Sequence, residues 1–170
     1  IIGFILKNKI ESWLGSVQIF AWALIVGGVV LIACDYIFKP QNQTKKIDDL
    51  NLKQSAALGF FQSLALIPGV SRSGATIVGG LFMKLSKKEA AEFSFFLAVP
   101  TMAAATLYKS IKIIPTINMQ EFGLITIGSL VAFLVAYVAI KTFIHIVGKY
   151  GFLYFGVYRI VLGAIILILG

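Results

Sequence analysis

The residues best suited to bind and transform a substrate lie in one short run that reads PGVSRSGAT. Ser71 and Ser73 place hydroxyl groups on either side of Arg72, whose guanidinium presents a fork of donors that matches phosphate oxygens. Gly69 and Gly74 allow unusual backbone conformations and close approach of the main chain to a ligand. If a helix opens at this run, its first amide groups add further donors and a partial positive charge. The combination predicts a cradle for a phosphate group.

A second polar side chain is expected close to this run. Gln62 precedes Pro68 by six residues, on the helix that leads into the run. Its amide could orient a phosphate or a water molecule, or it could form a buried hydrogen bond between helices. A simpler interpretation of the run itself is a Gly/Ser hinge, with Arg72 extending to the membrane surface.

Composition indicates the kind of structure that must position these residues. The chain has 170 residues, and 59% are hydrophobic, against roughly 45 to 50% in soluble domains. Only 13% are charged, which argues against a disordered chain and a nucleic-acid-binding arm, and the single cysteine argues against a disulfide scaffold. With one cysteine and one histidine, the chain cannot form a Cys/His metal site of several ligands. The composition is that of a membrane protein.

Uncharged apolar stretches predict the membrane-spanning helices, because a helix needs about 20 apolar residues to cross a bilayer. We expect an all-α integral membrane bundle that forms a single membrane domain. The predicted spans cover about residues 15–38, 88–108, 121–143 and 152–169.

Residues 52–86 are predicted to form a re-entrant helix-loop-helix hairpin instead. The stretch is apolar, but Pro68 and Gly69 interrupt it midway and leave two arms too short to cross about 30 Å. Non-helical backbone at membrane depth persists only where it is buried in protein or lines a cavity. The interruption therefore indicates a site.

The distribution of lysines favours the re-entrant arrangement, because short cytoplasmic loops are enriched in Lys and Arg. A re-entrant hairpin places nine lysines on one side and four on the other, whereas a fully crossing hairpin gives six and seven. The nine are Lys39, Lys45, Lys46, Lys53, Lys84, Lys87, Lys88, Lys141 and Lys149, and the four are Lys7, Lys9, Lys109 and Lys112.

Four segments resemble one known family. The run from Gln62 to Ile77, QSLALIPGVSRSGATI, closely resembles the second signature of the bacterial undecaprenyl-diphosphatase family. The segments EFSFFLAVP, from Glu92, and YRIVLG, from Tyr158, are similar to later parts of the family pattern, as is the first helix, AWALIVGGVVLI. The similarity covers essentially the whole chain.

This resemblance implies a fold of two inverted repeats, each of which contributes a re-entrant hairpin to a central site facing the outer leaflet. It implies hydrolysis of undecaprenyl diphosphate to undecaprenyl phosphate and phosphate, which recycles the carrier lipid for cell-wall synthesis in the bacterial inner membrane. The expected partners are a polyprenyl diphosphate and membrane lipids, with a homodimer possible and no nucleic acid. A divalent cation, Mg or Ca, is the expected cofactor.

The resemblance also implies roles for individual residues. Arg72 would hold and neutralise the diphosphate, with Ser71 and Ser73 as its hydroxyl partners in catalysis. The implied substrate-binding residues are Gly69, Gly74, Ala75, Thr76 and Gln62.

The sequence departs from the family pattern in one respect. The first repeat, with its glutamate-rich segment and a loop similar to PISSTGH, has no counterpart here. We therefore expect an N-terminally truncated chain without metal ligands of its own, which would not hydrolyse substrate alone.

Some interpretations stay open at this point. The inverted-repeat, broken-helix design also fits a transporter or flippase for a phosphorylated lipid or anion. For Arg159, a structural role, in which it pairs with a carboxylate such as Glu92 or bonds helix ends, is favoured over contact with substrate. Glu92 could also support the site. Asp35 is expected to pair with Lys39 at a helix end.

Overall fold

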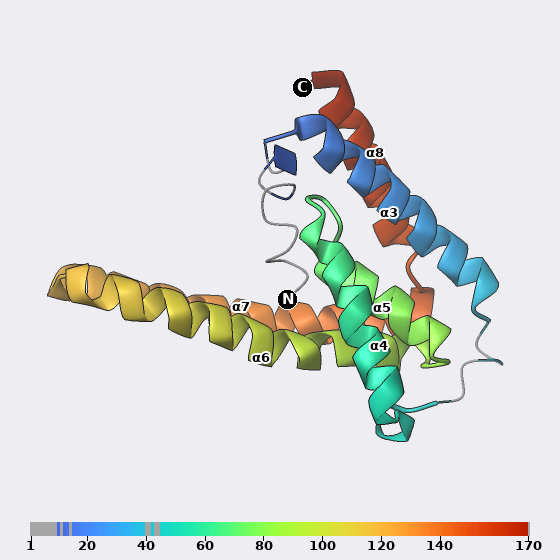
Figure 1. The fold of residues 1–170 in the computed structure, drawn as a ribbon, viewed down its shortest axis with the longest axis horizontal. Helices are drawn as coiled ribbons and strands as arrows, with labels where there is room; N and C mark the ends of the chain where they lie inside the picture. Colours follow the sequence, from blue (N-terminus) through green and yellow to red (C-terminus); the bar gives the residue numbers. More distant parts are fainter. Residues whose placement is uncertain (1–9, 11, 14, 40–41, 43–44, 170) are drawn as a thin grey trace.

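The computed structural model of the chain describes residues 10, 12–13, 15–39, 42 and 45–169. Its architecture is entirely helical, which confirms the predicted class (Figure 1). The main helices are α3 (Val17–Ile37), α4 (Leu52–Ser63), α5 (Arg72–Phe82), α6 (Lys87–Ile113), α7 (Met119–Tyr150) and α8 (Leu153–Leu169). Lys7 and Lys9, which entered the predicted lysine distribution, lie outside the described residues.

Polar caps fix where most of these helices begin. In each case a side-chain oxygen accepts a hydrogen bond from a backbone N–H three residues ahead and so satisfies a donor of the first turn. The capping residues are Ser16, Asn51, Ser71, Ser86 and Asn118. The helix α5 therefore starts immediately after Ser71, in the middle of the predicted phosphate cradle.

Three helices, α3, α6 and α7, are long and apolar enough to cross a membrane. The fourth predicted span corresponds to α8, which is apolar but has 17 residues and falls short of the usual length. Both α6 and α7 extend beyond the predicted ranges. The predicted spans stop where lysines interrupt the apolar sequence, but lysine is a good helix former, so the helices continue through these residues.

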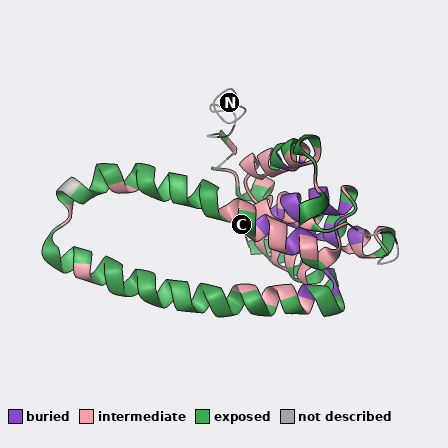
Figure 2. Ribbon diagram, turned by 90° about the horizontal axis from the view of Figure 1, so that it is seen from below, coloured by how far each residue is buried: buried purple, intermediate pink, exposed green. Residues whose placement is uncertain are grey.

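The helices form a compact body and a projecting arm. In the body, α3 and α8 run side by side in opposite directions, and α4 packs along α5 (Figure 1). The outer parts of α6 and α7 extend away from the body as an antiparallel pair whose surface is largely exposed (Figure 2). The buried core lies where α3, α5, α6, α7 and the start of α8 meet. It comprises Leu31, Cys34, Ile77, Leu81, Leu85, Ala90, Ala91, Val147 and Phe152.

Glycines bring α3 and α8 into backbone contact. A Cβ atom added to Gly28 would lie 2.6 Å from the carbonyl oxygen of Gly156, and one added to Gly156 would lie 2.7 Å from that of Gly28. A Cβ at Gly163 would meet the carbonyl oxygen of Ala21 at 2.8 Å. Small residues at such positions allow tight helix packing in membranes, so α3 and α8 form one closely packed pair.

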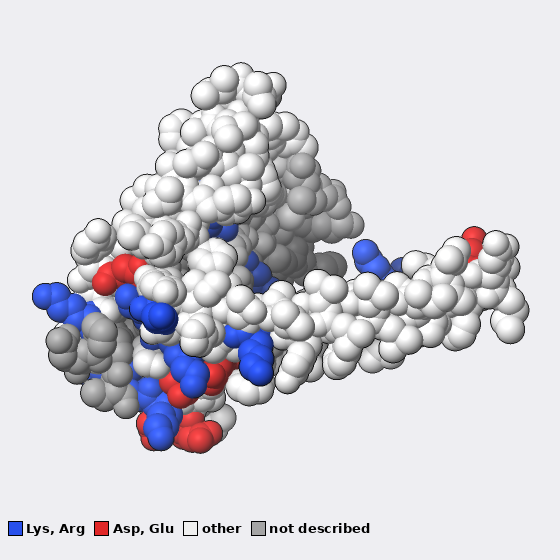
Figure 3. Space-filling view, turned by 180° about the vertical axis from the view of Figure 1, so that it is seen from behind, with Lys and Arg blue, Asp and Glu red and all other residues white. Residues whose placement is uncertain are grey.

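Charged residues gather at the end of the body where α4 begins (Figure 3). There the Asp35 carboxylate forms an ion pair with Lys87 at 2.6 Å and accepts a hydrogen bond from the Phe152 N–H at 2.7 Å. The contact to Lys87 is an ion pair without a well-aligned hydrogen bond. The predicted pairing of Asp35 with Lys39 is wrong, because packing brings the start of α6 to the end of α3.

Candidate anion-binding site

The loop between α4 and α5, residues 67–71, is called the signature loop below. Gly69 has a φ of +86°, a conformation that residues with side chains rarely adopt. A Cβ there would also lie 2.5 Å from the carbonyl oxygen of Phe20 on α3. Gly69 thus lets the loop turn and lie directly against the α3 backbone.

The first turn of α5 presents the donors that could bind an anion. Gly74 and Ala75 are two of the residues expected to bind substrate, but their amides are engaged within the turn. The Gly74 N–H donates to Ser71 Oγ at 3.1 Å, and the Ala75 N–H donates to the Ser71 carbonyl at 2.9 Å. The amides of Arg72 and Ser73 come first in the helix and have no intrahelical acceptor. The hydroxyls of Ser71 and Ser73 lie 3.1 Å apart, beside these amides.

The Arg72 guanidinium is held by two neighbouring helices. Its Nε and Nη2 both donate to Gln62 Oε1 on α4, at 3.2 and 3.1 Å. Nη2 also donates to the Leu97 carbonyl at 2.8 Å and to Thr101 Oγ1 at 2.6 Å, both on α6. The other terminal nitrogen, Nη1, makes no hydrogen bond to any residue that the structure describes, so it is the part of the fork left for a ligand.

Thr76 is buried against α6. Its hydroxyl lies 2.8 Å from Ser94 Oγ and within hydrogen-bond distance of the carbonyls of Arg72 and Ser73. Both hydroxyls are almost inaccessible, with Thr76 1% and Ser94 4% exposed. Thr76 therefore joins α5 to α6, and Ser94 is the partner that reaches the wall of the neighbouring pocket.

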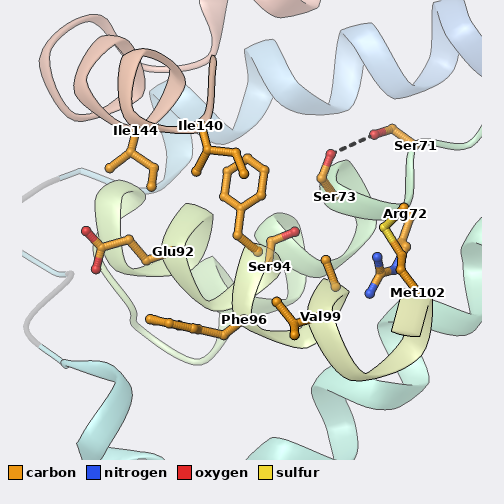
Figure 4. Close-up of a pocket in the computed structure, with 12 residues that line it drawn as sticks. Ser71, Arg72, Ser73, Glu92, Ser94, Phe96, Val99, Met102, Ile140 and Ile144 are labelled. Carbon is orange, nitrogen blue, oxygen red and sulfur yellow. Dashed lines mark hydrogen bonds between the residues drawn. The ribbon is translucent and has the colours of Figure 1, made fainter. Parts of the chain in front are cut away.

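A pocket of about 640 Å³ opens beside these groups, between α5, α6 and α7 (Figure 4). Ser71, Arg72 and Ser73 lie at one end, and Glu92, 3.7 Å from Lys88, lies at the other. The wall between is predominantly apolar. It includes Phe95, Phe96, Ala98, Val99, Met102, Ile140 and Ile144. The pocket thus suits a molecule with an anionic end and an apolar body.

Arg159 on α8 contacts the signature loop from the other side. Its Nη2 donates to the Gly69 carbonyl at 2.9 Å and, more weakly, to the Ala23 carbonyl at 3.4 Å. Its predicted carboxylate partner is not found: no ion pair joins it to Glu92 or to another described carboxylate. Its partners are instead backbone carbonyls of the signature loop and of the interior of α3, rather than the predicted helix ends.

The described residues do not form a site for a divalent cation. No three His, Cys, Asp or Glu side chains lie close enough together within the described part of the chain to hold a metal ion. Magnesium and calcium prefer several oxygen ligands, and the pocket offers one carboxylate, that of Glu92.

Sequence reasoning named Glu92 on α6, which lies at one end of the pocket, but missed the α6 residues that contact α5. Ser94, Leu97 and Thr101 follow one another at helical spacing on a single face of α6 and contact α5. The segment EFSFFLAVP contains two of them, but an apolar helix gives no sign of which face meets a neighbour. Ile140 and Ile144, one turn apart on α7, escaped prediction for the same reason.

Comparison with known proteins gives consistent relationships. A sequence model of the family described as Bacitracin resistance protein BacA matches residues 1–165. An undecaprenyl-diphosphatase from Bdellovibrio bacteriovorus is 60% identical over 170 residues, covering 99% of this chain and 65% of the relative. The undecaprenyl-diphosphatase of Wolinella succinogenes is 41% identical over 167 residues, covering 98% of this chain and 65% of the relative. That of Flavobacterium psychrophilum is 44% identical over 172 residues, covering 99% of this chain and 64% of the relative. The chain spans just under two thirds of the length of these relatives.

Proposed function

The chain belongs to the family of bacitracin resistance protein BacA, and from this premise we propose that it is part of a membrane enzyme that hydrolyses undecaprenyl diphosphate. The products would be undecaprenyl phosphate and phosphate, released at the inner membrane of a bacterium. One observation carries the proposal: Arg72, Ser71 and Ser73 lie together at one end of an otherwise apolar pocket. The relatives named undecaprenyl-diphosphatase support it.

The polar end of the pocket would bind the diphosphate. Ser71, Arg72 and Ser73 all line this end of the pocket, and the candidate donors are Nη1 of Arg72, the amides of Arg72 and Ser73 and the two serine hydroxyls. Donors that are already oriented stabilise the charge that develops on a transferring phosphoryl group, which is the main source of catalysis in such reactions. Gln62 and Thr101 would act by fixing the guanidinium.

The apolar wall would hold the first isoprene units of the lipid. Phe96, Val99 and Met102 lie along α6, and Ile140 and Ile144 face them from α7 (Figure 4). Branched, apolar isoprene units contact such side chains without leaving polar groups unpaired. The pocket would therefore select a lipid diphosphate over a soluble one by the burial of its tail.

The α4–α5 unit would enter the membrane as a re-entrant hairpin. Its helices have 12 and 11 residues, and at 1.5 Å per residue they extend about 18 and 17 Å, well short of a bilayer core of about 30 Å. The charged end of the body lies where α4 begins (Figure 3). The hairpin would thus carry the signature loop from that surface towards the middle of the membrane.

A metal ion has no step in this proposal, because the described residues lack a cluster of carboxylate ligands. Metal-binding carboxylates in the part of the relatives that this chain does not match stay a prediction. The chain alone is accordingly expected to bind the substrate without hydrolysing it.

The proposal is tested with a hybrid protein in which these 170 residues replace the matching segment of the B. bacteriovorus relative. We expect the purified hybrid to release phosphate from undecaprenyl diphosphate in detergent, and the 170-residue chain to release none. A hybrid that folds but releases no phosphate would contradict the proposal. Because detergent micelles have no compartments, phosphate release also distinguishes a hydrolase from a lipid or anion transporter.

A further inference from the structure

We propose that Arg159 is a positioning residue that fastens the signature loop to the α3/α8 pair, so that Ser71, Arg72 and Ser73 face the pocket. The catalytic part of this inference rests on the proposed function, whereas the structural part does not. Arg159 lies outside the run that first indicated a site, 90 residues beyond Gly69 in the sequence.

The hydrogen bonds of Arg159 end on the loop itself. Nη2 donates to the Gly69 carbonyl at 2.9 Å, two residues before the cap of α5. Within the loop, residues 67–70 form a turn in which the Val70 N–H donates to the Ile67 carbonyl at 3.1 Å. Because Gly69 also lies against the α3 backbone, Arg159 holds the loop at the point where it touches the rigid helix pair.

The space for this guanidinium is created by a glycine on α3. A Cβ atom at Gly27 would lie 2.7 Å from Arg159 Nη2 and 3.3 Å from Cζ. On α8, Arg159 lies between Gly156 and Gly163, the residues that bring the two helices into contact. The guanidinium is therefore enclosed by close helix packing, so its position is determined by the fold.

The arginine has no neutralising partner among the residues that the structure describes. No described carboxylate forms an ion pair with it, and its Nε is buried without a hydrogen-bond acceptor. A charge kept within an apolar bundle is costly and usually serves a function. The strongest contact that Arg159 makes is to the loop, which identifies the loop as the element it serves.

The cavities around the loop favour an indirect role over contact with substrate. Arg159 lines a cavity of about 270 Å³ between α3, α4 and α5, separate from the pocket that holds Arg72. Ser71 is the one residue common to the two linings. Arg159 therefore lies behind the loop, with the substrate pocket in front of it.

The structural test displaces Arg159 without changing its charge. Gly27→Ala forces the guanidinium away from Gly69, and the displaced atoms belong to the end of a flexible side chain, so the fold should persist. Gly59→Ala is the matched control, because a Cβ there meets nothing within 4 Å. Arg159→Gln is a second variant that removes the guanidinium.

Hydrogen exchange of the 170-residue chain in detergent then reports on the loop. The amides of Val70, Gly74 and Ala75 each donate a hydrogen bond here, and we expect them to exchange at least about tenfold faster in Gly27→Ala and Arg159→Gln. Exchange in α3 and α8 should be unchanged, as should all exchange in Gly59→Ala. Unchanged loop exchange in both test variants overturns the inference, whether or not the hybrid protein is active.

Kinetics of the hybrid protein separate positioning from contact with substrate. Misplacement of a catalytic group by about 1 Å costs up to about 100-fold, so we expect Gly27→Ala to lower kcat about 10- to 100-fold with little change in KM. Gly59→Ala should retain full activity. A large loss of activity with unchanged loop exchange would show direct contact with substrate and overturn the positioning role.

Discussion

Gln62 offers a sharp test of how the site treats negative charge. Gln62 lies on α4, and its side-chain oxygen accepts hydrogen bonds from Nη2 and Nε of Arg72 at 3.1 and 3.2 Å. The amide group carries no net charge. Gln62→Glu keeps the size and the acceptor but places a carboxylate in the same position. The new charge would bind Arg72 more strongly and repel an incoming diphosphate.

The size of this effect follows from Coulomb's law. An anion bound at Nη1 would lie roughly 6 Å from the new carboxylate, and at an effective dielectric constant of about 20 two unit charges repel by about 3 kcal/mol. Since about 1.4 kcal/mol corresponds to a factor of ten, KM for undecaprenyl diphosphate should rise about 100-fold. Gln62→Met, which removes the acceptor without adding charge, should cost about tenfold, because Leu97 and Thr101 still hold the guanidinium.

The assay is phosphate release by the hybrid protein in detergent across a range of substrate concentrations. A KM for Gln62→Glu within about threefold of the unsubstituted hybrid would refute the reasoning, since the diphosphate could not then lie beside Arg72. Equal losses in Gln62→Glu and Gln62→Met would show that orientation of the guanidinium, and not charge, is the role of this position.

Two further predictions concern stability, measured by thermal unfolding of the detergent-solubilised chain. Thr76→Val leaves the buried Ser94 hydroxyl without its 2.8 Å partner and should lower the free energy of unfolding by about 1–3 kcal/mol. Adding Ser94→Ala should restore much of that stability. Unchanged stability in Thr76→Val would contradict the prediction. Asp35→Ala removes the ion-pair partner of Lys87 and the hydrogen-bond acceptor of the Phe152 N–H, and it should cost about 1–3 kcal/mol. A neutral result would mean that neither group depends on Asp35.

Local sequence was sufficient to single out the residues that form the polar end of the pocket. The run around Arg72 combines a helix cap, glycines and hydroxyl side chains, and each of these acts over a few residues. The same holds for Gln62, because only residues 64–71, which include a 3-10 turn, separate its helix from α5 and limit where it can lie. Local rules therefore predicted that Gln62 faces the loop, although not that it binds Arg72.

Contacts between helices that are distant in the sequence could not be predicted from the sequence. A helix in a membrane is apolar on all sides, so its hydrophobic pattern does not reveal which face meets another helix. Thr101 and Arg159 lie 29 and 87 residues from Arg72, and packing of whole helices brings both to the loop region. The ion pair between Asp35 and Lys87 is unpredictable for the same reason, since sequence proximity favours Lys39 and Lys87 lies at the start of another helix.

Binding of the diphosphate by Arg72 at the start of α5 can be measured through kcat/KM of the hybrid protein with Arg72→Ala and with Arg72→Lys. We expect Arg72→Ala to lower kcat/KM at least about 100-fold, as for loss of a donor that stabilises the transition state. Arg72→Lys should recover little, because one ammonium group cannot replace a fork that bonds Gln62 and Thr101 while it contacts phosphate. Full activity in a folded Arg72→Ala hybrid would show that Arg72 does not bind the diphosphate.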